Sequence, residues 1–551
     1  MDQVKAGSLA AEVFQRHGVE YVFGIPGGHV YPMMAGCAQR GIGFIGVRHE
    51  MTAAFAAEGW ALTTGRLGVC TGTAGPGVTN LLTGMANAAS GGYPVLYFGG
   101  RARVGEFDRN QLQDFYQLPL VEPMAKYARQ VADPRRLPEY ISQAIAQATT
   151  GRPGPVYIEM ARDLMEQGVD PATVALPGAS PVARPQADPA AIAAAAALIS
   201  GAQRPVLLIG AGAWWSQAQR ELTDFVEQTG LPFFTRNAAR GLIPDQHRLY
   251  MNVGYNHPVF LQALRQADLA IVVGTRPGFT LSRQVFPPGL PIIRIDIDAA
   301  EVTNQLDVTL PLVGDVRQVI TQLSAALPAN SPERAAAMAG WAGSIKQVCH
   351  AVSASFAPAM TSDQYPIHPA RLMAEIAARV DQDTIVVIDG GDAAIWGTSF
   401  LPAPGPGQML GISSTSFGPL GVGMGYAIAA ALAHPGKRIL HLTGDGAFGY
   451  GAMEYDTCLR YGLNNITTVI LNDSMWGMIK RSEAKQDVDA TDFVGVDLRD
   501  THYERVVEAL GGYGEFVDRA DRIGPAIDRA LAAGKPACVN VMTDPTIGPP
   551  A

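Results

Sequence analysis

Short apolar runs recur along the whole chain, and stretches with apolar residues at helical spacing separate them. Such runs are typical of buried parallel strands, because helices cover both faces of a parallel sheet. The two clearest runs extend from Arg438 to Thr443 and from Ile466 to Leu471, with helical spacing from Tyr450 to Tyr461 between them. This alternation predicts an α/β protein built on parallel sheets.

The same alternation covers the rest of the sequence, whose 551 residues are enough for three or four domains. Two stretches, residues 166–188 and about 328–364, are expected to be linkers. Asp188 is the expected N-cap of a helix. Outside the linkers we expect helices at 3–18, 51–61, 81–89, 189–199, 215–229 and 366–380, and strands at 21–24, 44–50, 94–99, 154–159, 205–210, 232–235, 269–274, 291–296, 384–389 and 536–541.

Polar residues follow the two clearest strands where each one ends. Asp445 lies between two glycines after the first strand, and Asn472 and Ser474 follow the second. Open α/β sheets place ligands at the carboxyl ends of their strands. The Asp445 carboxylate, the Asn472 amide and the Ser474 carbonyl supply the oxygens that Mg²⁺ prefers, and the glycines let a diphosphate approach the backbone. A Gly-Asp-Gly string alone is usually a turn, so the spaced asparagine carries the prediction.

Two further residues near the N-terminus have a structural and a functional interpretation. His29 lies in a loop of glycines and proline after an expected strand, where it can cap the next helix or transfer protons. Glu50 opens the expected helix 51–61, where a carboxylate favours the positive end of the helix dipole. The residues alone leave both alternatives open.

A glycine-rich string from Gly68 to Asn80 leads from an expected strand into a helix. With Glu50 and the metal motif it gives the chain its resemblance to the thiamine-diphosphate-dependent enzymes, the superfamily of acetolactate synthase, benzaldehyde lyase and 2-hydroxyacyl-CoA lyase. The resemblance spans essentially the whole chain. It implies three doubly wound α/β domains with parallel sheets, which are a pyrimidine-binding domain (1–165), a middle domain (188–328) and a diphosphate-binding domain (365–551).

The resemblance also implies roles for residues that match the motifs. Glu50 is expected to hydrogen-bond the aminopyrimidine ring of the cofactor and so to activate its thiazolium carbon, with His29 and Gln113 as the other catalytic residues. Leu420 is expected to bend the cofactor. The metal ligands are Asp445, Asn472 and Ser474. The expected cofactor-binding residues are Gly27, Gly28, Thr73, Pro76, Gly77, Asn80, Gly391, Asp392, Ala393, Gly418, Leu420, Gly444, Asp445, Gly446, Ala447, Asn472, Trp476, Gly477 and Met478.

His29 and Gln113 favour one branch of the superfamily, because acetolactate synthases usually carry a small residue at the histidine position. The implied reaction is lyase or carboligase chemistry on 2-hydroxy ketones, aldehydes or 2-oxo acids through an enamine. Ser482 replaces a tryptophan of the branched-chain synthases, and Asp473 and Ser474 replace the amides usual in benzaldehyde lyase. The alternatives are an acetolactate synthase-like decarboxylase or synthase, a 2-hydroxyacyl-CoA lyase, and, least favoured, a silent regulatory subunit.

Three smaller features bear on the ligands. Gly210 and Gly212 resemble the start of a dinucleotide loop, but Trp215 replaces its third glycine, so FAD or ADP in the middle domain is not favoured. If a nucleotide does bind there, Asp296 and Asp298 are the candidates to contact its ribose. Lys480 and Arg481 are expected to form a solvated helix face or to bind a carboxylate or phosphate of the substrate.

Composition limits the classes of binding partner and the cellular compartment that we expect. A net charge of −9 argues against nucleic acid or an anionic membrane, and no apolar run approaches a membrane span. Five cysteines without paired spacing, and an N-terminus that lacks a signal-peptide core, favour the cytoplasm. The resemblance implies small carbonyl substrates and a homodimer or homotetramer with active sites at the interface. The chain ends soon after its last expected strand, so we expect it to lack the C-terminal lid of the coenzyme A lyases.

Overall fold

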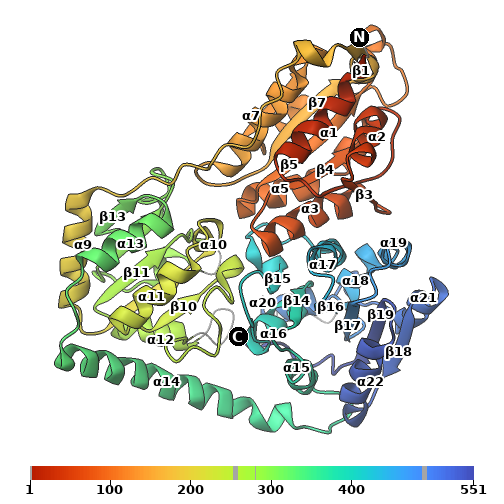
Figure 1. Ribbon diagram of the computed structural model, residues 1–551. Coiled ribbons are helices and arrows are strands. Elements are labelled where there is room, and N and C mark those ends of the chain that lie inside the picture. Colours follow the sequence, from red (N-terminus) through yellow and green to blue (C-terminus); the bar gives the residue numbers. More distant parts are fainter. Residues whose placement is uncertain (1–2, 252–257, 279–280, 487–492, 551) are drawn as a thin grey trace. The chain divides into compact units, whose positions relative to one another are not determined.

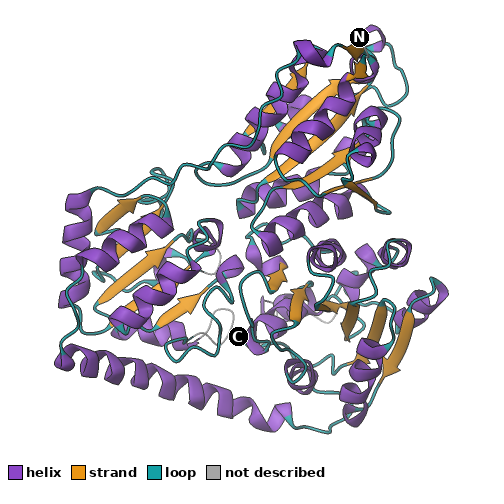
Figure 2. Cartoon of the chain, viewed as in Figure 1, coloured by secondary structure: helices purple, strands orange, loops and turns teal. Residues whose placement is uncertain are grey.

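Three parallel sheets flanked by helices form the body of the structure, a computed structural model that describes residues 3–251, 258–278, 281–486 and 493–550 (Figure 1; Figure 2). The predicted fold class of three α/β domains with parallel sheets is confirmed. The domain boundaries remain a prediction. A separate antiparallel pair joins β1 (Val4–Lys5) to β8 (Gly168–Val169).

The N-terminal sheet has the strand order β3-β2-β4-β5-β7-β6. One of its strands, β6, was not expected, because its edge position leaves Arg129 exposed and the run is not continuously apolar. The strands are β2 (Tyr21–Gly24), β3 (Gly43–Gly46), β4 (Gly68–Gly72), β5 (Val95–Arg101), β6 (Tyr127–Val131) and β7 (Val156–Ala161). The helices are α1 (Ala6–Arg16), α2 (Tyr31–Gln39), α3 (Glu50–Thr64), α4 (Pro76–Thr79), α5 (Leu82–Gly91), α6 (Leu118–Val121), α7 (Leu137–Thr149) and α8 (Arg162–Glu166).

The middle sheet has the order β10-β9-β11-β12-β13. Asp188 caps the first helix, because its side chain accepts the N–H groups of Ala190 and Ala191, as predicted. The expected helix 215–229 is wrong at its start, since Gln217 has a positive φ of 53° and separates two helices. The elements are α9 (Pro189–Gly201), β9 (Pro205–Ile209), α10 (Ala211–Trp215), α11 (Gln219–Thr229), β10 (Phe233–Thr235), α12 (Pro258–Gln266), β11 (Leu269–Val273), β12 (Ile292–Asp296), β13 (Leu310–Val313) and α13 (Val316–Ala326).

The C-terminal sheet has the order β15-β14-β16-β17-β19-β18, so the two strands that precede Asp445 and Asn472 are neighbours. The segment from Tyr450 to Tyr461 is mostly helical, as predicted, but it is divided between α18 and α19. The strands are β14 (Thr384–Ile388), β15 (Met409–Gly411), β16 (Arg438–Gly444), β17 (Ile466–Asn472), β18 (Tyr513–Val517) and β19 (Ala537–Met542). The helices are α15 (Pro369–Ala377), α16 (Asp392–Phe400), α17 (Val422–Ala433), α18 (Asp445–Gly451), α19 (Glu454–Arg460), α20 (Gly477–Gln486), α21 (Tyr503–Ala509) and α22 (Ala520–Ala532).

The expected linker 328–364 is mostly a long helix, α14 (Pro332–Met360), drawn in green in Figure 1. Ser331 caps its start, and Pro332 occupies the first helical position, where proline is favoured. The many small residues suggested a linker, yet apolar residues recur at helical spacing and are buried against the middle domain. These residues are Met338, Trp341, Ile345 and Cys349.

The chain forms two compact units. Unit 1 comprises residues 1–183, 417–435 and 451–464, and unit 2 comprises the remaining residues. Helices α17 and α19 therefore belong to unit 1. There α17 packs on α3 through glycines: a Cβ on Gly59 would lie 2.7 Å from the Tyr426 Cα, and one on Gly425 would lie 2.6 Å from the Phe55 Cβ.

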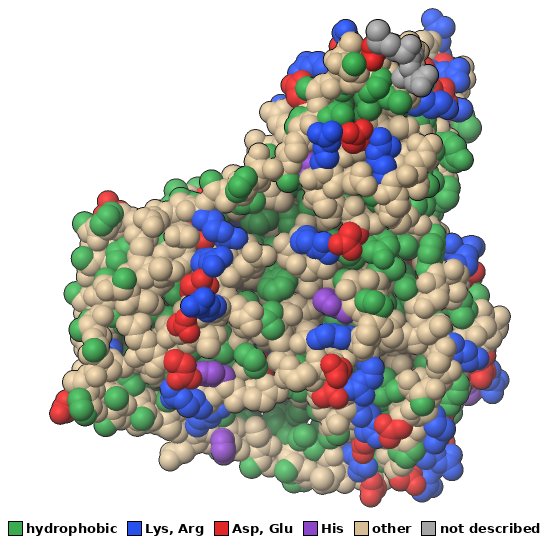
Figure 3. Space-filling view, in the orientation of Figure 1, with side chains coloured by type: hydrophobic (Ala, Val, Ile, Leu, Met, Phe, Trp, Pro, Cys, Tyr) green, Lys and Arg blue, Asp and Glu red, His purple; other side chains and the backbone are tan. Residues whose placement is uncertain are grey.

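Basic and acidic side chains are interspersed on the face of the molecule in Figure 3. Among the described residues, no helix is both long and apolar enough to cross a bilayer. The five cysteines are free and buried.

Candidate functional site

Two of the predicted metal ligands end neighbouring strands of unit 2. Asp445 follows β16 directly, and Asn472 is the last residue of β17. Gly444 is paired with Leu471 in the register of these strands, which brings the two side chains to the same edge of the sheet.

The Asp445 carboxylate is buried and only partly satisfied. Its Oδ1 accepts the N–H of Gly446 at 2.9 Å, whereas Oδ2 has no hydrogen-bond partner among the described residues. Burial, followed by the nearby Asp473 carboxylate, raises the pKa of Asp445 to about 7. A buried oxygen without a donor is costly, and a hard cation would satisfy it. The site therefore fits Mg²⁺.

The other two predicted ligands complete an oxygen donor set. The Asn472 side chain donates to Asn540 Oδ1 at 3.0 Å, and its own Oδ1 accepts the Ser474 N–H at 3.1 Å. Ser474 has a positive φ of 55°, and its carbonyl accepts the Leu498 N–H at 2.8 Å, which leaves one lone pair of that carbonyl. In the described part of the chain no cluster of three or more His, Cys, Asp or Glu residues could hold a metal. A site here depends on amide and carbonyl oxygens.

Three loops come together around this donor set. Gly390 has a φ of 99°, and a Cβ there would lie 3.0 Å from the Gly444 nitrogen. A Cβ on Gly446 would lie 2.5 Å from the Trp476 ring. The predicted diphosphate half is thus assembled within unit 2, with further members Gly391, Asp392, Ala393, Ala447, Gly477 and Met478 on the same loops and helix starts.

Arg481 is largely buried and is paired within the protein. Its guanidinium pairs with the carboxylates of Asp392 and Asp473, the latter at 2.9 Å, and donates to the Pro545 carbonyl at 2.7 Å. These pairs contradict the interpretation as a solvated helix face, whereas binding of a substrate carboxylate or phosphate stays a prediction. Lys480 pairs with Asp497 at 2.7 Å, with about a third of its side chain exposed.

Glu50 lies in unit 1, at the start of α3. The side chain of His49 caps this helix by accepting the Met51 N–H. Glu50 is buried, and its Oε2 accepts from Asn80 Nδ2 at 3.0 Å. Asn80, the last residue of the glycine-rich string, thus holds one carboxylate oxygen of Glu50, and Oε1 remains as the second acceptor.

His29, Thr73 and Gln113 form a chain of side chains in the same unit. His29 Nδ1 lies 2.9 Å from Thr73 Oγ1, which lies 3.3 Å from Gln113 Oε1. Because Gln113 Oε1 can only accept, the threonine hydroxyl donates to it and accepts from His29 Nδ1–H. Burial in the first place, and the charge of Arg162 in the second, lower the pKa of His29. The imidazole is thus neutral near pH 7, with Nε2 unprotonated.

The remaining predicted residues of unit 1 lie on glycine-rich turns. A Cβ on Gly27 would lie 2.5 Å from the Thr73 Cβ, and a Cβ on Gly77 would lie 2.8 Å from the Thr73 Cγ2. Leu420 is half-buried and precedes Gly421, which caps α17 with a φ of 90°. Gly28, Pro76 and Gly418 lie on the same three segments.

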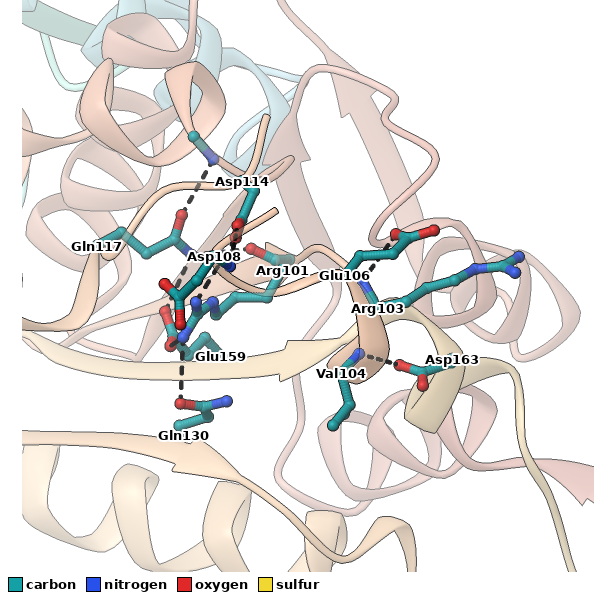
Figure 4. A network of polar contacts seen from close by, with 12 residues as sticks. Arg101, Arg103, Val104, Glu106, Asp108, Asp114, Gln117, Gln130, Glu159 and Asp163 are labelled. Carbon is teal, nitrogen blue, oxygen red and sulfur yellow. Dashed lines mark hydrogen bonds and ion pairs between the residues drawn. The ribbon is translucent and has the colours of Figure 1, made fainter. Parts of the chain in front are cut away.

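A buried polar network beneath these loops was not predicted. Gln117, Glu159 and Arg101 are its centre (Figure 4). A charged residue in the otherwise apolar strand Val156–Ala161 was the available sequence signal for Glu159. Gln117 gave no such signal, because it lies in an irregular segment with no periodic pattern.

Three family models match the chain in succession. They are the N-terminal TPP binding domain of thiamine pyrophosphate enzymes over residues 4–120, the central domain over 192–323, and the C-terminal TPP binding domain over 389–541.

Relatives match over nearly the full length. A probable acetolactate synthase of Mycobacterium bovis is 35% identical over 553 aligned residues, covering 99% of this chain and 97% of the relative. Human 2-hydroxyacyl-CoA lyase 1 is 28% identical, covering 99% of this chain and 95% of the relative. The 2-hydroxyacyl-CoA lyase of Arabidopsis thaliana is 28% identical, with 98% and 96% covered.

Proposed function

Because the chain belongs to the thiamine pyrophosphate enzyme family and is a thiamine-diphosphate-dependent enzyme of lyase or carboligase type, we propose that it cleaves or joins C–C bonds of 2-hydroxy ketones, aldehydes or 2-oxo acids. The observation that carries the substrate class is the chain of hydrogen bonds from His29 through Thr73 to Gln113. It presents an imidazole base and an amide donor side by side.

Bound thiamine diphosphate supplies the carbon nucleophile and the electron sink that C–C bond cleavage needs. Glu50 would hold its pyrimidine end through Oε1, while Asn80 fixes the other carboxylate oxygen. Asp445, Asn472 and the Ser474 carbonyl would hold Mg²⁺ and the diphosphate. The partnerless Asp445 Oδ2 supports this assignment.

His29 would move the proton of the substrate. Its unprotonated Nε2 takes a proton from the hydroxyl of a 2-hydroxy ketone as the neighbouring C–C bond breaks, and returns one in the joining direction. Burial keeps the imidazole neutral in the free enzyme. Gln113 Nε2 is left to donate to the substrate oxygen, because its Oε1 is engaged by Thr73.

A second candidate is a 2-oxo acid decarboxylase or synthase of the acetolactate type. The name of the Mycobacterium bovis relative, at 35% identity, supports it. Use of coenzyme A thioesters is a third, supported by the names of the human and plant relatives.

The quaternary structure and compartment belong to the same proposal. Cofactor-binding residues are divided between two units of the chain, which supports a homodimer or homotetramer with shared sites. Five free, buried cysteines support a reducing compartment such as the cytoplasm.

The test is incubation of the purified protein with thiamine diphosphate and Mg²⁺, and separately with benzoin, acetoin, benzaldehyde and pyruvate. Aldehyde release from benzoin or acetoin, or ligation of benzaldehyde, is expected, and both should be lost in Glu50→Gln. Carbon dioxide release from pyruvate without cleavage of hydroxy ketones would favour the second candidate. No cleavage, ligation or decarboxylation of any of them would overturn the proposal.

A further inference from the structure

Gln117 is a fully buried side chain that joins the loop at Gly75 to the end of strand β5 in unit 1. Its Oε1 accepts the N–H of Gly75 at 3.0 Å, and its Nε2 donates to the Gly100 carbonyl at 2.8 Å. The same nitrogen lies 2.9 Å from Glu159 Oε2 and 2.8 Å from the Tyr157 hydroxyl. Each polar atom of this amide therefore has a partner in the protein.

Both backbone groups held by Gln117 lie against the proposed catalytic residues. A Cβ on Gly100 would lie 2.5 Å from the His29 Cβ, so the His29 loop rests on this end of β5. A Cβ on Gly75, whose φ is 60°, would lie 2.9 Å from the Gln113 carbonyl oxygen. Thr73, which bonds both catalytic side chains, is two residues from Gly75. One amide side chain thus connects three loops.

Glu159 extends the connection to the segment of Gln113. Its carboxylate is fully buried and accepts from Gln117 and from the Tyr157 hydroxyl at 2.9 Å. Arg101 lies 3.5 Å from Glu159 and 3.8 Å from Asp114, the residue after Gln113 (Figure 4). Removing one partner of such a buried network leaves the others desolvated and unpaired.

The segment that carries Gln113 is strained and needs this support. Asp108, Asn110 and Gln113 all have positive φ values, of 62°, 54° and 61°. Non-glycine residues adopt this region only when the surroundings determine it. Asp114 contributes, since its Oδ2 accepts the Asp108 N–H at 2.8 Å while Oδ1 faces Arg101.

We propose that Gln117, held by Glu159, is a positioning residue that fixes the His29 loop, the Thr73–Gly75 loop and the Gln113 segment relative to one another. The inference rests on the proposed function, because the roles of His29 and Gln113 belong to it. Gln117 touches no reacting atom and acts through the backbone at Gly75 and Gly100.

The first test is hydrogen–deuterium exchange of the full chain without cofactor, which needs no activity. Gln117→Met keeps the side-chain length and removes both the donor and the acceptor. Amides in 26–31, 73–80 and 108–116 are expected to exchange about tenfold faster or more, as loss of a buried hydrogen bond implies, while α1 and α7 are unchanged. Tyr157→Phe is the matched control, because it removes one bond to Glu159 and one to Gln117 Nε2 but leaves both bonds from Gln117 to the backbone at Gly75 and Gly100.

The milder variant Glu159→Gln tests the same proposal if Gln117→Met does not fold. It keeps the shape and should accelerate exchange in the same three segments by a smaller factor. Equal exchange of these segments in Tyr157→Phe and in the folded Gln117 or Glu159 variants would overturn the proposal, whatever the enzyme does.

The second test is kinetic, with a substrate that the wild type turns over. Gln117→Met should lower kcat/KM by about 10- to 100-fold, the scale expected when a catalytic group is displaced by about 1 Å. Added to His29→Ala, it should cost less than about threefold more, since a residue that acts through His29 has little left to lose. If the losses in kcat/KM of the two single variants multiply in the double variant, the proposal is overturned. An inactive wild type would contradict the proposed function instead, and the exchange result would stand on its own.

Discussion

Glu58 is a buried carboxylate that the proposed reaction does not use, and its replacement by glutamine gives a pH-dependent prediction. It lies on α3 of unit 1 with no exposure. Its Oε2 accepts from Asn87 at 2.6 Å and from the Tyr426 hydroxyl at 3.0 Å, whereas Oε1 has no partner in the described part of the chain. Burial is the dominant cause that raises the pKa of Glu58 well above 4.5, and the two hydrogen bonds oppose it only in part.

The sign of the effect follows from linkage. A carboxyl with a raised pKa in the folded state contributes its full stability below the unfolded pKa, near 4.3, and loses it as pH rises toward the folded pKa. Across that interval the folded state holds a proton that the unfolded state has released. The free energy of unfolding of unit 1 should therefore fall by about 1.4 kcal/mol per pH unit from this group alone.

Glu58→Gln removes this titration, so its stability relative to the wild type should rise with pH. Above the unfolded pKa this gain approaches about 1.4 kcal/mol per pH unit. Hydrogen–deuterium exchange of peptides from α3 and α17, corrected for intrinsic rates, should show a protection ratio that grows about tenfold per pH unit. Glu20→Gln, at an exposed site of the same unit, is the control. A protection ratio that does not change with pH would refute the reasoning. An added difference that is the same at every pH would not, provided that the ratio still grows with pH.

Three further predictions concern the proposed site. Glu50→Gln should lower kcat by about 10²- to 10⁴-fold, and an unchanged deprotonation rate of the cofactor by NMR would contradict its role. Asp445→Ala should abolish the rise in Tm that Mg²⁺ with thiamine diphosphate gives the wild type, and a retained rise would refute the ligand assignment. Gly75→Ala should destabilise unit 1 by about 1–3 kcal/mol, because the residue has a positive φ and its Cβ would lie 2.9 Å from the Gln113 carbonyl. Gly105→Ala, with nothing within 4 Å, should change stability by less than about 0.5 kcal/mol, and equal losses in both would contradict the steric argument.

The central strands of the three sheets were predictable because each is short, apolar and bounded by turn residues. Such a strand is buried on both faces, so a continuous run of apolar residues identifies it in the sequence, as in β16 and β17. Four of the edge strands, β6, β13, β15 and β18, were not predicted. In β6 the exposed Arg129 interrupts the apolar run. Helix α14 was missed for a different reason. Its composition is rich in small residues, and only the middle domain, which it covers, explains why Trp341 and its neighbours are apolar.

The candidate site divides in the same way. Asp445 and Asn472 were predictable because each lies at the end of an apolar strand, and a short stretch of sequence is enough to identify such a strand. The pairing of Arg481 with Asp392 was not, since 89 residues separate them and a basic residue near a helix end has many possible partners. Such pairs become visible only once the register of the sheet is known.

The two halves of the site are held by different kinds of contact, which determines how each responds to substitution. In unit 2 the loops meet through glycines and backbone groups, so a larger residue at Gly446 would collide with the Trp476 ring. In unit 1 the loops meet through the Gln117 amide and the Glu159 carboxylate, so a residue of equal size but different polarity is enough to release them. The size of the new side chain therefore determines the effect of a substitution around the diphosphate half. Hydrogen-bonding capacity determines it around His29 and Gln113, the residues proposed to act on the substrate.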